Sequence, residues 1–110
     1  MNADGTIKDL IRSITAKIVA EYQPERILLF GSYAYGVPDL DSDVDLLIIK
    51  DTPERAIDRR IRVRRILRDA QRKIPCSPVI ITPAELKSRL AKGDQFLETI
   101  LTQGELLYAA

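Results

Sequence analysis

Histidine and tryptophan are absent from this chain of 110 residues, and Cys76 is its only cysteine. A single cysteine cannot form an intrachain disulfide. Without histidine, the usual zinc sites and His-based catalytic triads are excluded. Any catalysis would therefore depend on carboxylates, hydroxyls and metal ions that prefer oxygen ligands.

Long apolar runs are also missing, and no stretch approaches the roughly 20 residues needed to span a bilayer. The first residues, MNADGTIKDLIRS, lack the basic region, apolar core and cleavage site of a secretory signal. These absences predict a cytoplasmic protein without a membrane-spanning segment. A chain of this length is expected to form one domain over residues 1–110, which leaves no room for a second domain that holds a substrate.

Apolar residues at three- and four-residue spacing predict a first amphipathic helix, over residues 6–22, with Thr6 and Asp9 as a capping box. Start and stop signals predict three more helices. Pro53 lies in the first turn of one, Thr82 caps the next, and Gly104 ends the last. The predicted ranges of these three are 53–73, 82–90 and 94–102.

Short apolar runs predict three strands: RILLFGS (26–32), VDLLIIK (44–50) and SPVIIT (77–82). A fourth run, ELLYA (105–109), is expected to close the chain as a short strand or an apolar tail. Pro78 favours an edge position for the third strand. The segment YAYGVPDLDS, between the first two strands, is expected to be a loop with a short helical turn after Ser32. The order αββαβααβ predicts an α+β, or α/β-like, fold in which helices flank a small mixed β-sheet.

Two carboxylates stand where the second strand begins. Side chains alternate along a strand, so Asp43 and Asp45 point the same way, with Cβ atoms about 6.6 Å apart. Such a pair can converge on one or two Mg²⁺ ions, a recurrent arrangement for displacement at phosphorus. Asp39 and Asp41, at the same two-residue spacing, are expected to belong to the preceding loop.

Gly31 and Ser32 end the first strand. A strand that ends in Gly-Ser lets backbone N–H groups approach an anion closely, and the hydroxyl adds a donor. Ten residues separate Ser32 from Asp43. The combination of an apolar strand, Gly-Ser, ten residues and D-x-D entering a second apolar strand predicts a phosphate and metal site.

This pattern resembles the nucleotidyltransferase superfamily related to DNA polymerase beta, and in particular its minimal members. The segments that carry the likeness are ILLFGS (27–32), SDVDLLII (42–49), IITPAEL (80–86) and GDQFLETILTQGELLY (93–108), together with Gly36. The resemblance implies the nucleotidyltransferase fold. It also implies that Gly31 and Ser32 hold a nucleotide triphosphate, and that Asp43 and Asp45 bind the catalytic Mg²⁺ ions.

The implied reaction is attack by an acceptor hydroxyl on the α-phosphorus of ATP, with loss of pyrophosphate. Minimal members are often antitoxins that transfer an adenylyl group to a helical toxin partner of the HEPN type. The apolar end of the chain, FLETILTQGELLYAA, is expected either to complete the core or to form a contact in a dimer or hetero-oligomer.

Two positions depart from the family's pattern. Catalytic members usually carry a third carboxylate at the start of the third strand, where CSPVIITPAEL (76–86) places Ser77. A hydroxyl is neither a good base nor a strong Mg²⁺ ligand. Tyr35 stands where relatives often have arginine. Either the chain is a nucleotidyltransferase in which another acid such as Asp41 enters the site, or it is a catalytically impaired module that binds nucleotide and partner.

Arginine is concentrated in residues 55–73, which hold eight arginines and Lys73. The arginines surround most of the predicted helix, as in a solvated helix whose arginine stems cover apolar neighbours. A surface for an acidic partner or for RNA stays open as the alternative. Aromatic residues are absent from this segment, which argues against nucleic acid as the partner.

Overall fold

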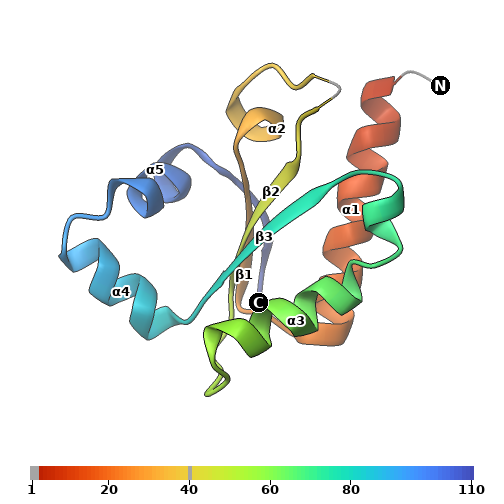
Figure 1. The fold of residues 1–110 in the computed structure, drawn as a ribbon. Helices are drawn as coiled ribbons and strands as arrows, with labels where there is room; N and C mark the ends of the chain where they lie inside the picture. Colours follow the sequence, from red (N-terminus) through yellow and green to blue (C-terminus); the bar gives the residue numbers. More distant parts are fainter. Residues whose placement is uncertain (1–2, 40) are drawn as a thin grey trace.

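The computed structural model describes residues 3–39 and 41–110, with side chains from residue 7 onward apart from residue 40. These described residues form five helices, four strands and one 3-10 turn in the order α1, β1, α2, β2, α3, η1, β3, α4, α5, β4 (Figure 1). The helices are α1 (Ala3–Tyr22), α2 (Ser32–Tyr35), α3 (Ala56–Ile66), α4 (Pro83–Ala91) and α5 (Gln95–Gln103), and η1 is Ala70–Arg72. The strands are β1 (Arg26–Phe30), β2 (Val44–Ile49), β3 (Cys76–Ile81) and β4 (Glu105–Ala109).

The four strands form one sheet in the order β3-β2-β1-β4. β1 pairs antiparallel with both β2 and β4, whereas β2 and β3 are parallel. The predicted α+β fold with a small mixed sheet is therefore confirmed, including the helical turn after Ser32. Pro78 lies in an edge strand, as predicted, where the N–H that proline lacks is not needed for a ladder on both sides of the strand.

The sheet separates two apolar clusters, and Figure 1 shows α1 on one side of it and α4 with α5 on the other. On the first side, Ile14 and Ile18 of α1 and Val63 of α3 pack against Leu29 and Leu46. The opposite face, called here the α4/α5 face, carries a second cluster: Leu28, Phe30, Leu47, Ile49 and Ile81 of the strands with Leu86, Leu97 and Ile100 of the helices. Because side chains alternate between the two faces of a sheet, β1 and β2 contribute buried residues to both clusters.

Two predicted helix boundaries are wrong. α1 begins at Ala3, so Thr6 lies inside the helix and is not its cap. α3 begins at Ala56 and ends at Ile66, so Pro53 precedes the helix. The early end has a packing reason: after Ile66 the chain tightens into η1, from which Gln71 hydrogen-bonds both the N–H and the carbonyl of Cys76 at the edge of β3.

The ends of α4 and α5 lie close to the positions predicted from the sequence. Thr82 caps α4 in a capping box with Glu85, and Asp94 caps α5. Gly104 ends α5, after which ELLYA forms β4 on the far edge from β3. Within the described residues, no helix is both long and apolar enough to cross a membrane.

Candidate functional site

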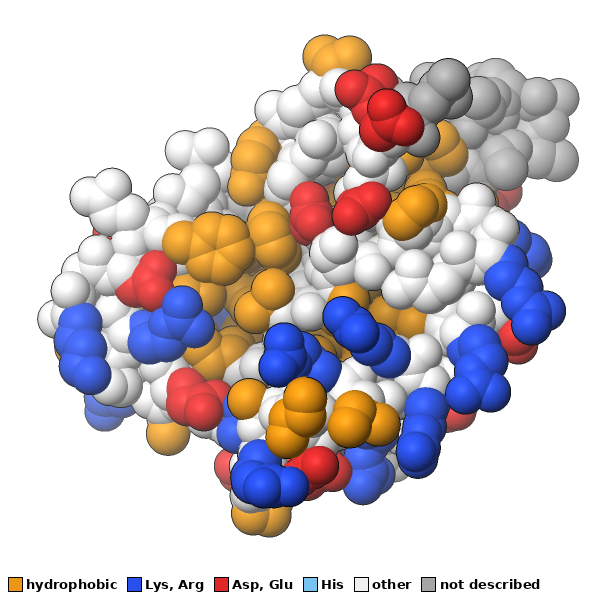
Figure 2. All heavy atoms as spheres, in the orientation of Figure 1, with side chains coloured by type: hydrophobic (Ala, Val, Ile, Leu, Met, Phe, Trp, Pro, Cys, Tyr) orange, Lys and Arg blue, Asp and Glu red, His pale blue; other side chains and the backbone are white. Residues whose placement is uncertain are grey.

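Three neighbouring strands present one row of side chains on the α4/α5 face. Asp45 of β2 lies directly opposite Phe30 of β1 on one flank and Ser77 of β3 on the other. Directly paired residues on adjacent strands share a face of the sheet. The row therefore reads Phe30, Asp45, Ser77, and it lies at the end of the sheet where α2 begins. Figure 2 shows acidic side chains on the molecular surface beside a group of apolar side chains.

Gly31 follows Phe30 and is in contact with the carboxylate of Asp45. Its φ of 74° lies in the region that favours glycine, and a Cβ added there would collide with Oδ2 of Asp45. Gly31 is also the N-cap of α2, and its carbonyl accepts hydrogen bonds from the N–H groups of Ala34 and Tyr35. In the described part of the chain, no hydrogen bond uses the N–H groups of Ser32 and Tyr33. N–H groups at the start of a helix can bind an anion.

Ser77 contacts the other predicted metal ligand. Its hydroxyl donates a hydrogen bond to Oδ2 of Asp43 over 3.0 Å. The position expected to hold a third carboxylate thus lies beside the two acids, but it holds a hydroxyl. The neighbouring Cys76 is buried, and burial followed by the charge of Asp43 raises the pKa of its thiol to about 11. Because this thiol stays protonated at neutral pH, it is not a nucleophile for the site.

The negative charges of Asp43 and Asp45 repel each other. Burial, and after it the charge of Asp43, raises the pKa of Asp45 above its ordinary value. Two repelling carboxylates with oxygen donors around them suit a hard divalent cation. No group of three or more acidic, cysteine or histidine side chains placed to hold a metal exists among the described residues. Asp43 and Asp45 are the residues that would hold a Mg²⁺ ion, which typically takes one or two carboxylates and completes its shell with water and substrate phosphates.

Asp39 and Asp41 belong to the loop, as predicted. The carboxylate of Asp39 accepts from the N–H of Asp41 over 2.8 Å, and its own N–H donates to the hydroxyl of Ser42 over 2.9 Å. This arrangement is a local turn that orders the approach to β2. Asp41 is exposed, and its N–H is used in this turn.

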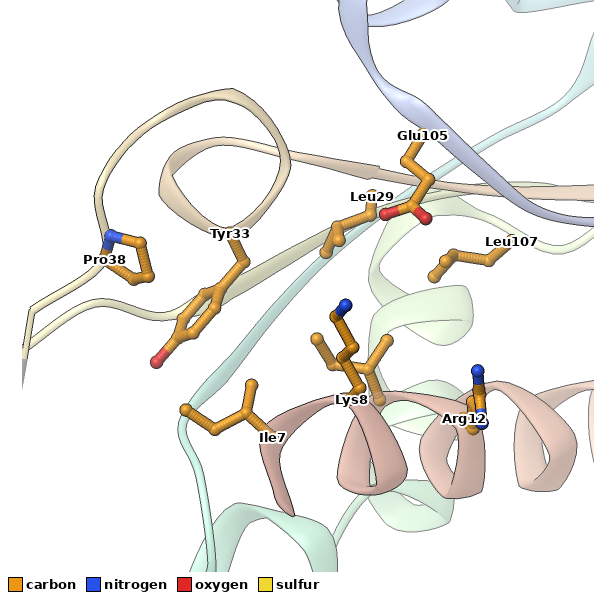
Figure 3. Close-up of a pocket in the computed structure, with 9 residues that line it drawn as sticks. Ile7, Lys8, Arg12, Leu29, Tyr33, Pro38, Glu105 and Leu107 are labelled. Carbon is orange, nitrogen blue, oxygen red and sulfur yellow. The ribbon is translucent and has the colours of Figure 1, made fainter. Parts of the chain in front are cut away.

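The two tyrosines of α2 differ in their surroundings. Tyr33 lines a cleft of about 360 Å³ between α1, α2 and β4, on the opposite side of the sheet from Asp45. Figure 3 shows Tyr33 and Pro38 at one end of this cleft, with Glu105 and Leu107 of β4 across from them. Tyr33 therefore packs beneath the loop and is not part of the candidate site. Tyr35 is exposed.

Most arginines of α3 lie on the surface, but Arg59 is buried. Its Nη1 donates to Oε1 of Glu85 over 2.7 Å, and its Nε donates to the carbonyl of Glu54 over 2.8 Å. Glu85 also caps α4, so this pair ties α3 to α4. Ile57 and Ile61 of the same helix are about half exposed. The arginine pattern thus includes a structural residue that helical spacing did not single out.

Sequence reasoning also missed the aromatic side of the site. Phe30 was expected only as part of a buried strand, and Phe96 only as part of an apolar tail. The two rings contact each other edge to face, with centroids 5.5 Å apart and planes at 88°. Strand alternation places Phe30 on the face of Leu28, but the pairing with Asp45 depends on the register of β1 with β2.

Comparisons with known proteins give the family. The family described as "Nucleotidyltransferase domain" matches residues 11–102, a range that includes Gly31, Ser32, Asp43, Asp45 and Ser77. A protein of Methanocaldococcus jannaschii, provisionally named a protein adenylyltransferase, is 39% identical over 85 residues. The alignment covers 74% of this chain and 56% of that relative, so the chain spans little more than half of the relative's length. The chain belongs to the nucleotidyltransferase domain family.

Proposed function

We propose that this chain binds ATP with Mg²⁺ and transfers the adenylyl group to a hydroxyl of a partner protein. The observation that carries the proposal is the convergence of Gly31, Ser32, Asp43 and Asp45 at one end of the sheet. Two carboxylates beside a Gly-Ser turn with backbone N–H groups combine a metal site with an anion site. The name of the archaeal relative favours a protein as the acceptor.

In the proposed reaction, the acceptor oxygen forms a bond to the α-phosphorus while the bond from that phosphorus to the β-bridging oxygen breaks. Pyrophosphate leaves with the electron pair, and the hydroxyl proton passes to water or to a carboxylate of the pair. Asp43 and Asp45 would hold Mg²⁺, which neutralises phosphate charge when bound. The chain itself supplies position: the missing side chain of Gly31 leaves room for the carboxylate of Asp45 beside the turn, and Ser32 adds a hydroxyl donor.

The acceptor we propose is a HEPN-type helical toxin, with this chain as its antitoxin. The test is incubation of the purified chain with labelled ATP, Mg²⁺ and the product of the adjacent gene. Transfer of label to that protein, abolished by Asp45→Asn, is the expected result. If the chain binds Mg-ATP but no label reaches any candidate acceptor, the proposal of adenylyl transfer is wrong.

A second function is favoured by the hydrogen bond between Ser77 and Asp43. Because a hydroxyl occupies the place of the third carboxylate, the chain would bind nucleotide and partner without efficient transfer, and neutralise the partner by covering it. Calorimetry with Mg-ATP on the wild type and on Asp43→Ala/Asp45→Ala tests the site that both functions share. Equal affinity in the two proteins would exclude this site. Neutralisation of the partner by an Asp45→Asn variant would favour covering over transfer.

A further inference from the structure

An exposed aromatic ring lies next to the proposed phosphate site. Phe96, in the first turn of α5, is 48% exposed, whereas Leu97 and Ile100 of the same helix are fully buried. α5 is therefore fixed to the sheet by other residues, and the ring of Phe96 is not needed to close the core. A lone exposed apolar residue needs no explanation. Phe96 is different, because its ring contacts Phe30, which lies beside Asp45.

The ring is held in place by a residue paired with Asp45. Phe96 packs edge to face on Phe30, with centroids 5.5 Å apart, and Phe30 is only 7% exposed. Phe30 in turn lies directly opposite Asp45, about 5 Å away between Cβ atoms for such a pair. Phe96 thus contacts a ring that lies beside Asp45 on the α4/α5 face of the sheet.

The two flanks of Asp45 are chemically different. On the β3 side, Ser77 offers a hydroxyl and a hydrogen bond to Asp43. On the β1 side, Phe30 and Phe96 offer only aromatic carbon. A nucleotide whose phosphates lie at Gly31 and Asp45 would direct its base toward the aromatic flank, where the apolar base face loses contact with water. The β3 flank then stays open to the acceptor hydroxyl.

We propose that Phe96 is the surface on which the base of the bound nucleotide stacks. The inference rests on the proposed function, because it takes the triphosphate to lie at Gly31, Ser32 and the two carboxylates. Aromatic side chains stack with bases strongly and with little preference among them, since every base has a π-face. Phe96 has no polar group, so it contributes affinity for a nucleoside and does not select one base by hydrogen bonding.

Comparison of ATP with inorganic tripolyphosphate tests the proposal, because tripolyphosphate lacks the nucleoside. Calorimetry in Mg²⁺ is performed on the wild type and on Phe96→Leu, which keeps an apolar side chain but removes the ring. Phe96→Leu is expected to weaken ATP binding about tenfold and to leave tripolyphosphate binding unchanged. Leu106→Ala is the matched control, since Leu106 is 56% exposed and pairs with Leu28 rather than with a residue of the site.

A fluorescence experiment gives an independent readout. The chain has four tyrosines but no tryptophan, so Phe96→Trp introduces a single tryptophan, which can be excited selectively. ATP with Mg²⁺ is expected to quench its emission, and tripolyphosphate is not. Leu106→Trp places the fluorophore elsewhere on the same face and is expected to respond to neither ligand. Circular dichroism of each variant checks that the fold is retained.

Each outcome separates this inference from the proposed function. If tripolyphosphate and ATP both fail to bind the wild type, the proposed function fails and the stacking inference falls with it. If tripolyphosphate binds and the folded Phe96→Leu variant binds ATP as well as the wild type, only the stacking inference is overturned. Unchanged ATP affinity together with weaker binding of the partner protein would show that Phe96 is a protein contact instead.

Discussion

The hydroxyl of Ser77 donates to Oδ2 of Asp43 over 3.0 Å, so the side chain at the third-acid position touches the carboxylate pair. A carboxylate placed there would reach the same region. We expect Ser77→Asp to raise Mg²⁺-dependent adenylyl transfer, because a third acid can accept the proton of the attacking hydroxyl or bind metal. General base catalysis contributes about 10²-fold or more, which sets the expected gain.

The measurement is the rate of label transfer from ATP to the acceptor. Ser77→Ala is the control, since it removes the hydrogen bond without adding a charge, and it is expected to give no gain. A folded Ser77→Asp variant that binds Mg-ATP but transfers no faster than the wild type would show that the missing acid does not limit the reaction.

Gly31→Ala is expected to disrupt both the fold and the site. The added methyl group would collide with the carboxylate of Asp45, and φ is 74°. Gly93 offers a matched control, because its φ of 81° is equally unfavourable for alanine but no atom lies within 4 Å of a Cβ added there. Each substitution should cost about 1 to 3 kcal/mol in the free energy of unfolding from backbone strain. Only Gly31→Ala should also abolish the binding of Mg-ATP, measured by calorimetry. Equal binding by the two variants would contradict a role for the contact between Gly31 and Asp45 in the site.

The carboxylate pair is expected to destabilise the chain when no cation is bound. Burial and the charge of Asp43 raise the pKa of Asp45 from its ordinary value of 3.8, so the ionised form is disfavoured in the folded state. The cost is fully present above the raised pKa and absent below the ordinary one. Asp45→Asn should therefore raise Tm at pH 7 in a chelator, and the gain should disappear as the pH falls below 3.8. Thermal unfolding across this range checks it, and a Tm below that of the wild type at pH 7 would contradict it.

The order of elements was predictable from the sequence because hydrophobic spacing and local start and stop signals mark most of them. Thr82 and Gly104 act within a few residues of their own helix ends, and both predictions were correct. The register across the sheet is different. That Phe30 and Ser77 flank Asp45 depends on pairings between segments far apart in sequence, which hydrophobic periodicity does not encode.

Arg59 shows the same limit at the level of one side chain. Helical spacing made it one arginine among eight, and only the packing of α3 beside α4 buries it against Glu85. The end of α3 was also missed, because the side chain of Gln71 bonds to the backbone of Cys76 instead of extending the helix. Local rules predicted a continuous helix, and a tertiary contact shortened it.

The ion pair of Glu85 and Arg59 predicts a pH dependence of stability. The hydrogen bond from Arg59, followed by that from the N–H of Thr82, lowers the pKa of Glu85 below 4.5. A lowered pKa means that the stabilisation is present above pH 4.5 and is lost as the pH falls through the folded value. Glu85→Gln is expected to cost about 1 to 2 kcal/mol at pH 7, since it weakens both a cap and the partner of a buried arginine.

Urea unfolding of the wild type and Glu85→Gln at pH 7 and at successively lower pH measures this difference. The gap between the two proteins should shrink below pH 4.5, because the wild type loses its charge there. Glu105→Gln, at an exposed position of β4, is the control and should track the wild type. A gap that stays constant into the acid range would mean that the ionised carboxylate contributes nothing to stability.

Tyr22, at the end of α1, buries a hydroxyl that has no hydrogen-bond partner among the described residues. Its ring is only 4% exposed, and the ammonium of Lys50 lies 5.3 Å from the ring centroid. Tyr22→Phe keeps the ring and this cation–π contact while it removes the unpaired hydroxyl. Because an unpaired buried hydroxyl costs about 1 to 3 kcal/mol, the variant should equal or exceed the wild type in the free energy of unfolding. Tyr22→Leu, which loses the ring, should be less stable than both. A loss of more than about 1 kcal/mol in Tyr22→Phe would show that the hydroxyl has a partner, such as a bound water.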